Sequence, residues 1–186
     1  GLALPPATDR KQRRKVESLL SGALSNMPES LTGKYYPLGG MTKSEEDTMQ
    51  SQGFLFQKPT PNTVLHNCGA ARDWPDGRGI FHNKDKTFLV WVNEEDHMRC
   101  ISMQNGGNVK EVFARFASAI DNVEGSLNKS GFSYAHDEHL GYITTCPSNV
   151  GTGMRASVML KLPKLHAKMG VHDLEELCDG MGLQAR

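Results

Sequence analysis

Residues 86–103 read KTFLVWVNEEDHMRCISM and form the centre of the predicted fold. The stretch begins as a near-continuous run of β-branched and aromatic residues, which is typical of a strand buried on both faces. Three consecutive carboxylates, a His and an Arg follow, and a second apolar run begins at Cys100. Desolvation and like charge both raise the pKa of clustered carboxylates, so this cluster is unfavourable unless it serves a cation or a proton transfer. This end of the strand is therefore the first candidate site.

The two adjacent glutamates are expected to face opposite ways if the strand stays regular. Alternation places Glu95 on the face of Trp91 and Asn93, and Glu94 on the face of Val92. The two carboxylates could then do different jobs. A hairpin turn with solvated acids is the alternative interpretation.

Composition predicts one compact domain. The chain has 186 residues, of which 38% are hydrophobic and 23% charged, and its 21 basic and 21 acidic residues give no net charge that would favour nucleic acid or a membrane surface. No stretch approaches the roughly 20 apolar residues of a membrane span, and the first residues lack the order of a signal peptide. The widely spaced cysteines indicate neither a zinc site nor a disulfide scaffold, and favour a reducing compartment.

Helices are predicted on both sides of the central hairpin. An amphipathic helix is expected over 9–27, and its basic run is either a solvated face or a partner or phosphate surface. A second helix begins at a capping box of Thr42 and Glu45 and ends at Gly53, before an irregular stretch to Gly79. A long helix follows, capped by Asn108 and closed by Gly131; its expected buried face consists of Val109, Val112, Phe113, Phe116, Ile120, Val123 and Leu127.

The last third of the chain predicts two strands, His139 to Cys146 and Ala156 to Leu162, and a helix from Val171 to Asp179. The strands are mostly antiparallel and the helices occur in mixed order. This pattern predicts an α+β fold in which helices flank an antiparallel sheet.

A second candidate site joins these two strands, where residues 145–155 read TCPSNVGTGMR. Cys146 ends a strand, and the hydroxyl of Ser148 can reach its sulfur, which favours a reactive thiolate. Gly151 and Gly153 let the backbone approach a ligand, and Arg155 can bind phosphate. The alternative is that Cys146 is an ordinary core residue.

Together the two motifs, 92–99 and 146–155, resemble the signature motifs of the phosphagen (guanidino) kinases. Residues 33–38, 54–56, 72–80 and 101–103 extend the resemblance over nearly the whole chain. It implies a glutamine synthetase-like catalytic domain that transfers a phosphoryl group reversibly between MgATP and a guanidino compound. Residues 72–76 and 145–149 resemble the dimeric creatine and glycocyamine kinases, whereas 155–158 lean toward the arginine kinases.

The resemblance also implies a role for each matching residue. Glu95 would orient the guanidinium and accept its proton, with Glu94 beside it, and Cys146 would position the guanidino group. Ser148 would tune the thiolate. Mg²⁺ would arrive with ATP, so no protein metal site is expected. The further assignments are phosphate binding by Arg99, Arg155 and Arg186, support by Asn149, Gly151 and Gly153, and Met159 and Gly53 in place of two histidines that lie near adenine in many members.

The resemblance further implies that residues 1–186 are part of the catalytic domain, without the N-terminal helical domain and the C-terminal end, and are inactive in isolation. ATP or ADP and a guanidino substrate are the expected ligands, in a homodimer or a related heterodimer that buffers cellular energy. Nucleic acid and a membrane span are not expected. The expected compartment is the cytoplasm, with the mitochondrion as the alternative. Two other functions stay open, a protein-arginine kinase and a non-catalytic interaction module.

Overall fold

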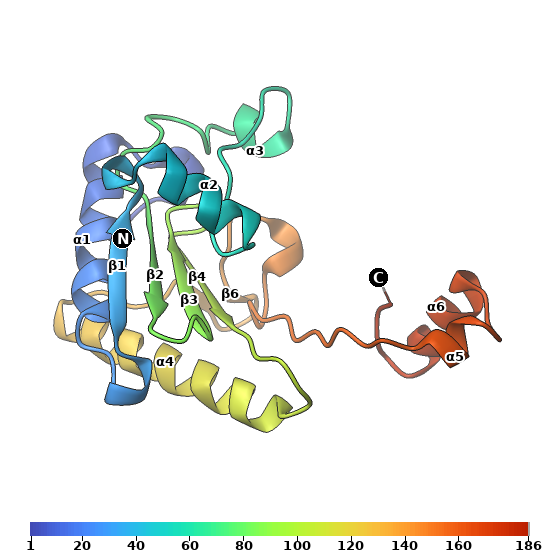
Figure 1. Ribbon diagram of the computed structural model, residues 1–186. Coiled ribbons are helices and arrows are strands. Elements are labelled where there is room, and N and C mark those ends of the chain that lie inside the picture. The colour runs from blue at the N-terminus through green and yellow to red at the C-terminus, as the bar shows by residue number, and fades with distance from the viewer. Residues whose placement is uncertain (186) are drawn as a thin grey trace. The chain divides into compact units, whose positions relative to one another are not determined.

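The computed structural model describes residues 1–185, and the chain divides into two compact units, Gly1–Gly153 and Met154–Arg186 (Figure 1). Each unit is described by itself. The division falls just before Ala156–Leu162, the predicted strand, which is assigned to no strand here. Val158 and Leu160 on it are 60% and 66% exposed. An alternating apolar segment forms a strand only where a neighbouring strand pairs with its backbone.

A four-stranded antiparallel sheet is the centre of the first unit, in the order β1-β2-β3-β4. The strands are β1 (Gly33–Pro37), β2 (Gly79–Asn83), β3 (Phe88–Val92) and β4 (Met98–Ser102). The predicted central hairpin is confirmed as β3 and β4, in which Val90 lies opposite Cys100. β2 was not predicted. Together with the helices described next, the sheet confirms the α+β class.

Both faces of β3 are buried, as predicted. Phe88, Val90 and Val92 pack against α1 (Arg10–Leu24) and α4 (Val109–Lys129), which cover one face of the sheet. Leu89 points to the other face and packs with a separate cluster, which consists of Leu38, Leu55, Phe56 and Ile80, with Met49 of α2 (Lys43–Ser51) and Trp91 at its margin. Burial of each large apolar side chain stabilises the fold by about 1.5–3 kcal/mol.

The predicted helix boundaries are confirmed by their caps. Thr42 and Glu45 form the capping box of α2, and Gly53 has a φ of 72° just past its end. Asn108 caps α4, and Gly131 has a φ of 77° after it. The apolar face of α4 is buried only in part.

Val109 and Phe113, in the first turns of α4, are each 54% exposed, which corrects the expectation that they are buried. The cluster that α1 and the sheet form with α4 contains Ala119, Val123 and Leu127 instead. The second half of α4 therefore packs against the core, whereas its first turns are largely exposed.

The basic run at the start of α1 is mostly exposed, except for Arg13, and three of its arginines form ion pairs within the chain. Arg13 is 2% exposed, and its Nη1 lies 3.2 Å from Asp73 Oδ2. Arg10 lies 2.8 Å from Asp73, and Arg14 lies 3.0 Å from Asp76. These ion pairs connect the segment around Trp74 to α1, so the three arginines serve the fold of their own chain.

Shorter elements complete the two units. The first contains α3 (Val64–Asn67), β5 (His136–Asp137), β6 (Gly141–Tyr142) and short 3-10 helices at Pro5–Ala7, Glu29–Leu31, Leu38–Gly40 and Pro147–Asn149. The predicted strand from His139 to Cys146 shrinks to β6, because Asp137 Oδ1 accepts the backbone N–H groups of His139 and Leu140 and forms a turn. The second unit contains α5 (Pro163–His166) and α6 (Val171–Gly180), which confirms the last predicted helix.

Candidate active site

The first-motif loop, residues 93–97, begins where β3 ends at Val92. Asn93 has a φ of 55°, so the chain leaves the extended conformation at once, and its N–H donates to the carbonyl of His97 over 3.0 Å. The strand does not stay regular, so the alternation from which opposite faces were predicted for Glu94 and Glu95 does not reach them. The two carboxylates lie in a closed loop.

Asn93 anchors this loop to two distant segments. Its side chain is 2% exposed, and Nδ2 donates to the carbonyls of Arg13 and Gly77 over 3.0 and 2.7 Å. An Asn tolerates the left-handed conformation better than most residues with a side chain. The loop is thus fixed to the first turn of α1 and to the chain just before β2.

The carboxylates of the first-motif loop are partly desolvated. The Glu94 side chain is 16% exposed, and its Oε2 lies 3.7 Å from Nη1 of Arg99. Burial raises the pKa of Glu95, and the charges of Glu94 and Asp96 raise it further, against the opposing charge of Arg99. This combination of burial and like charge favours a functional cluster over a turn of solvated acids.

Arg99 on β4 is held beside the carboxylates and still reaches solvent. Its guanidinium lies over the ring of Trp91, 5.3 Å from the ring centre, and its side chain is 50% exposed. Trp91 is itself fixed, because its Nε1 donates to the carbonyl of Phe54 over 2.7 Å. An arginine in this setting can bind a phosphate through its free N–H groups.

The second-motif loop, residues 146–151, is closed by local pairing. Cys146 Sγ and Ser148 Oγ lie 3.0 Å apart, as the sequence predicted. The N–H of Tyr142 donates to the carbonyl of Gly151 over 2.7 Å, and the N–H of Gly151 donates back over 3.2 Å. A Cβ on Gly141 would lie 2.5 Å from the Gly151 carbonyl oxygen, so a glycine is required for this close approach.

The two motif loops meet through one short hydrogen bond. Asp96 Oδ1 accepts the N–H of Thr145 over 2.6 Å. Asp96 follows Glu95 in the chain, and Thr145 precedes Cys146. The bond therefore brings the carboxylate cluster and the thiol, which are about fifty residues apart in the chain, to one place.

Orphaned polar atoms concentrate at this junction. Within residues 1–185, six buried side-chain nitrogen or oxygen atoms make no hydrogen bond, and four of them belong to Asn93, Glu94, His97 and Thr145. Buried polar atoms are normally hydrogen-bonded, so an exception needs an explanation. A positively charged ligand with N–H donors could bond to two of these atoms, the Asn93 amide oxygen and the Glu94 carboxylate oxygen.

The remaining predicted site residues belong to several segments of the chain. Asn149 lies in the 3-10 helix Pro147–Asn149, and a Cβ on Gly153 would lie 3.5 Å from Cβ of Tyr142. Arg155 and a fully exposed Met159 belong to the second unit. Gly53 lies past the end of α2. Arg186 lies outside the described residues.

Sequence reasoning did not single out Asn93, Asp96 or Trp91 as site residues. Asn93 carried a signal, because an Asn between a buried strand and a charged run is suited to a left-handed turn. Asp96 and Trp91 had no such signal in the sequence. Each bonds to a backbone group of a distant segment, and backbone groups leave no mark on the residue type.

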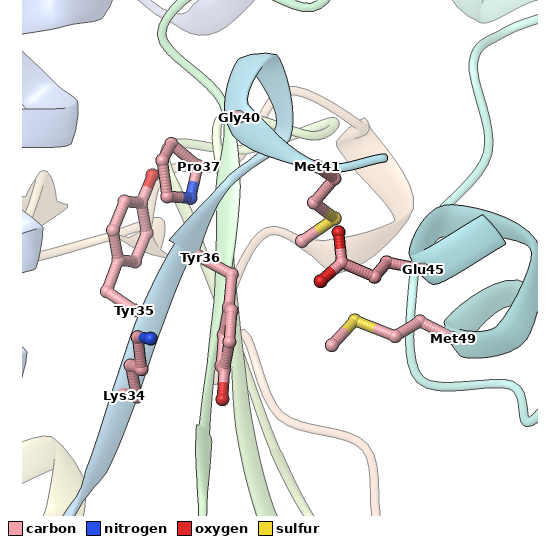
Figure 2. A pocket seen from close by; sticks show the side chains of 8 residues that line it. All are labelled: Lys34, Tyr35, Tyr36, Pro37, Gly40, Met41, Glu45 and Met49. Atoms are coloured by element: carbon pink, nitrogen blue, oxygen red, sulfur yellow. The ribbon is translucent and has the colours of Figure 1, made fainter. Parts of the chain in front are cut away.

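A cavity of about 260 Å³ lies apart from the motif loops, between β1 and α2 (Figure 2). Glu45 at its rim already accepts the N–H and the hydroxyl of Thr42, and Tyr36 stacks on His82 with ring centres 5.0 Å apart. The Glu45 carboxylate and the Tyr36 ring are thus engaged within the fold. The cavity is lined by Lys34, Tyr35, Tyr36, Pro37, Gly40, Met41, Glu45 and Met49.

No group of three or more His, Cys, Asp or Glu residues among residues 1–185 is arranged to hold a metal ion. None of the helices in this range has the length and apolar character needed to cross a membrane.

Comparison with known proteins agrees with this geometry. The family described as ATP:guanido phosphotransferase, C-terminal catalytic domain, matches residues 15–186. Lombricine kinase of Eisenia fetida is 51% identical over 188 residues, which cover 100% of this chain and 49% of that protein. Creatine kinase M-type of Gallus gallus is 50% identical, again over 100% of this chain and 48% of that protein. The chain spans about half the length of these curated relatives.

A solved structure gives the same result. The duplicated taurocyamine kinase from Schistosoma mansoni with bound transition state analog components is 46% identical, with a TM-score of 0.90 over 100% of this chain and 25% of that chain. The match over residues 15–186 and the identity of about half over the full chain lead to one conclusion: the chain belongs to the ATP:guanido phosphotransferase family.

Proposed function

We propose that the protein that carries this chain transfers a phosphoryl group reversibly between MgATP and a small guanidino compound. The observation that supports this most directly is the junction at Asp96 and Thr145, which places a partly desolvated carboxylate cluster next to a thiol. Arg99 lies at the edge of the same cluster. A planar cation and an anionic phosphate can therefore be bound side by side.

In the proposed reaction a guanidino nitrogen attacks the γ-phosphorus of ATP. The new P–N bond forms as the bond between the γ-phosphorus and the bridging oxygen breaks, and ADP leaves with that oxygen. The proton lost by the guanidinium passes to the carboxylate of Glu95. Burial and the neighbouring acids raise the pKa of Glu95, which makes it a better base than a solvated glutamate.

Positioning and charge neutralisation supply most of the catalysis in phosphoryl transfer. Arg99 would bind the phosphates, helped by Arg155 and Arg186, and Mg²⁺ enters as part of the MgATP substrate. A carboxylate pairs with a guanidinium through two parallel hydrogen bonds, so Glu95 and Glu94 would set the direction of the attacking nitrogen. Cys146, with the Ser148 hydroxyl 3.0 Å away, would hold the guanidino group from its other side.

The finer assignments belong to the same proposal. Residues 72–76 and 145–149 favour creatine or glycocyamine as the substrate, and energy buffering in the cytoplasm, or alternatively the mitochondrion, as the role. Gly151 and Gly153 would let the backbone approach the ligand, with Asn149 in support. Met159 and Gly53 would lie near adenine. A dimer, and a catalytic domain that includes residues 1–186, complete the proposal.

The experiment is a coupled assay on the protein at its natural length, with MgATP and a panel of acceptors. The panel consists of creatine, glycocyamine, lombricine, taurocyamine, arginine and an arginine-containing peptide. We expect transfer to one of the small compounds, and a fall of about 10²-fold or more in kcat/KM for Glu95→Gln. Glu138→Gln, in the exposed turn between β5 and β6, is the matched control and should keep its activity.

Two outcomes would replace the proposal. Transfer to the peptide alone would make the protein a protein-arginine kinase. Transfer to no acceptor by a folded protein would favour a non-catalytic module.

A further inference from the structure

The bond between Asp96 and Thr145 has a role beyond bringing the two motifs together. We propose that Asp96 is a positioning residue: by accepting the N–H of Thr145 it fixes the Cys146 thiol relative to the Glu95 carboxylate. This inference rests on the proposed function, because it concerns the geometry of that site. Asp96 itself need not touch the substrate.

The loop that carries Asp96 is fixed to the core. Its loop is closed by the 3.0 Å bond from Asn93 to His97, and Asn93 is bonded to the carbonyls of Arg13 and Gly77. Asn93 is buried and adjoins β3, the central strand of the core. The position of the Asp96 carboxylate is therefore set by the sheet and by α1.

The segment that carries Cys146 is held far more weakly. In the described chain, the other hydrogen bonds of residues 143–150 run to residues 135–150, as in Ile143 to Ala135 and Thr144 to Cys146. β5 and β6, on which the segment rests, have two residues each. The Asp96 bond thus connects a small local hairpin to the main sheet.

The bond itself is strong and hard to replace. At 2.6 Å between a backbone nitrogen and a carboxylate oxygen it is short for its type, as expected of a charge-assisted hydrogen bond. The Oγ1 of Thr145 is buried and makes no hydrogen bond, so its side chain gives the segment no further attachment. Without Asp96, only the hairpin would determine where Cys146 lies.

The mechanism makes this positioning important. Reacting groups must be held to a fraction of an ångström, and a misplacement of about 1 Å can lower the rate about 10²-fold. Glu95 and Cys146 would contact the guanidino group from two separate loops. The distance between these loops is what the Asp96 bond controls.

The test compares Asp96→Asn with Asp96→Glu at natural chain length. Asn keeps an acceptor oxygen in place without the charge, whereas Glu keeps the charge but displaces the carboxylate by one methylene. We expect Asn to keep kcat within about fivefold and Glu to lose about 10-fold or more, with the KM for MgATP changed less than threefold in both. Asp85→Asn, on the exposed turn between β2 and β3, is the control and should match the wild type.

The reverse order would overturn the inference, because an impaired Asn variant and an active Glu variant would mean that the charge matters and the bond does not. Wild-type rates in both variants would overturn it as well. A merely structural role would lower the melting temperature without separating kcat from KM.

A second readout does not need kinase activity. Mass spectrometry of iodoacetamide-treated protein gives the rate of alkylation of Cys146 relative to Cys68, an exposed internal reference. We expect this ratio to change about threefold or more in Asp96→Glu and to stay near the wild-type value in Asp96→Asn. An unchanged ratio in both variants would refute the positioning role, and an inactive wild type with the expected ratios would refute only the proposed function.

Discussion

The two motif loops are built in contrasting ways. The first, residues 93–97, is bonded through Asn93 to α1 and to Gly77, and it follows directly from a strand buried on both faces. The second, residues 146–151, is closed mainly by its own hairpin, and Ser148 is exposed. The contrast indicates that the carboxylates are held in place by the core before any ligand binds, whereas the thiol depends on local pairing and on Asp96. Four changes would test it.

The largest effect is expected from breaking the anchor of the first loop. Asn93→Ala removes the side-chain donor to the buried carbonyls of Arg13 and Gly77 and puts an alanine at a φ of 55°. The Arg13 carbonyl keeps its intrahelical bond, because Arg13 lies within α1, but the Gly77 carbonyl loses its donor. An unpaired buried carbonyl costs about 1–3 kcal/mol and a left-handed alanine about 1–2 kcal/mol, so the free energy of unfolding should fall by about 3 kcal/mol. Urea denaturation measures the change.

Asn122→Ala is the matched control for this variant. Asn122 also has a buried side-chain oxygen, but that oxygen makes no hydrogen bond in the described structure, so its removal should change stability by less than about 1 kcal/mol. Equal losses in the two variants would mean that Asn93 is not an anchor.

The second loop should respond to a change at Gly141. Gly141→Ala places a Cβ 2.5 Å from the Gly151 carbonyl oxygen at a φ of 75°, and should lower stability by about 2 kcal/mol and alter the alkylation rate of Cys146. Gly106→Ala is the control. Gly106 also has a positive φ, 98°, but no atom lies within 4 Å of an added Cβ, so this variant measures the backbone strain without the steric contact. A loss no larger than that of Gly106→Ala would show that the Gly151 contact can relax.

The ionised carboxylate of Glu95 in the first loop should lower the free energy of unfolding. The folded state raises the pKa of Glu95, so protonation of Glu95 favours folding, and its contribution to stability is lost as the pH rises through the folded pKa. Glu95→Gln should therefore have a higher Tm than the wild type at pH 7, and the difference should shrink as the pH is lowered toward about 4. A pH-independent difference would contradict this account.

The smallest effect is expected at His97, at the end of the first loop. Burial lowers the pKa of His97 from 6.5, against a backbone hydrogen bond to Ala3 and the charge of Asp96. His97 therefore binds a proton at a higher pH in the unfolded state than in the folded state. The wild type should lose stability as the pH falls below about 6.5. His97→Gln should flatten this part of a Tm–pH profile, and His139→Gln, at an exposed position, should not.

Local patterns were enough to predict the buried strand β3, the long helix α4 with its Asn108 cap, and both motifs. The failures share a cause, which is contact over long sequence distance. The alternation of Glu94 and Glu95 ends at Asn93, whose conformation depends on carbonyls 80 and 16 residues away. The basic run of α1 finds its acids some 60 residues on. The segment Ala156–Leu162 has the pattern of a strand but is assigned to none, and β2 has no alternation that marks it.

Deamidation of Asn93 would damage this site. Both of its bonds are made by the amide nitrogen as a donor, so an aspartate of the same shape cannot replace it. Spontaneous hydrolysis of that amide would set a carboxylate oxygen against the carbonyl oxygens of Arg13 and Gly77. A single deamidation would then break both bonds that connect the carboxylate loop to α1 and to the approach to β2, which makes the chemical lifetime of one side chain a limit on the lifetime of the site.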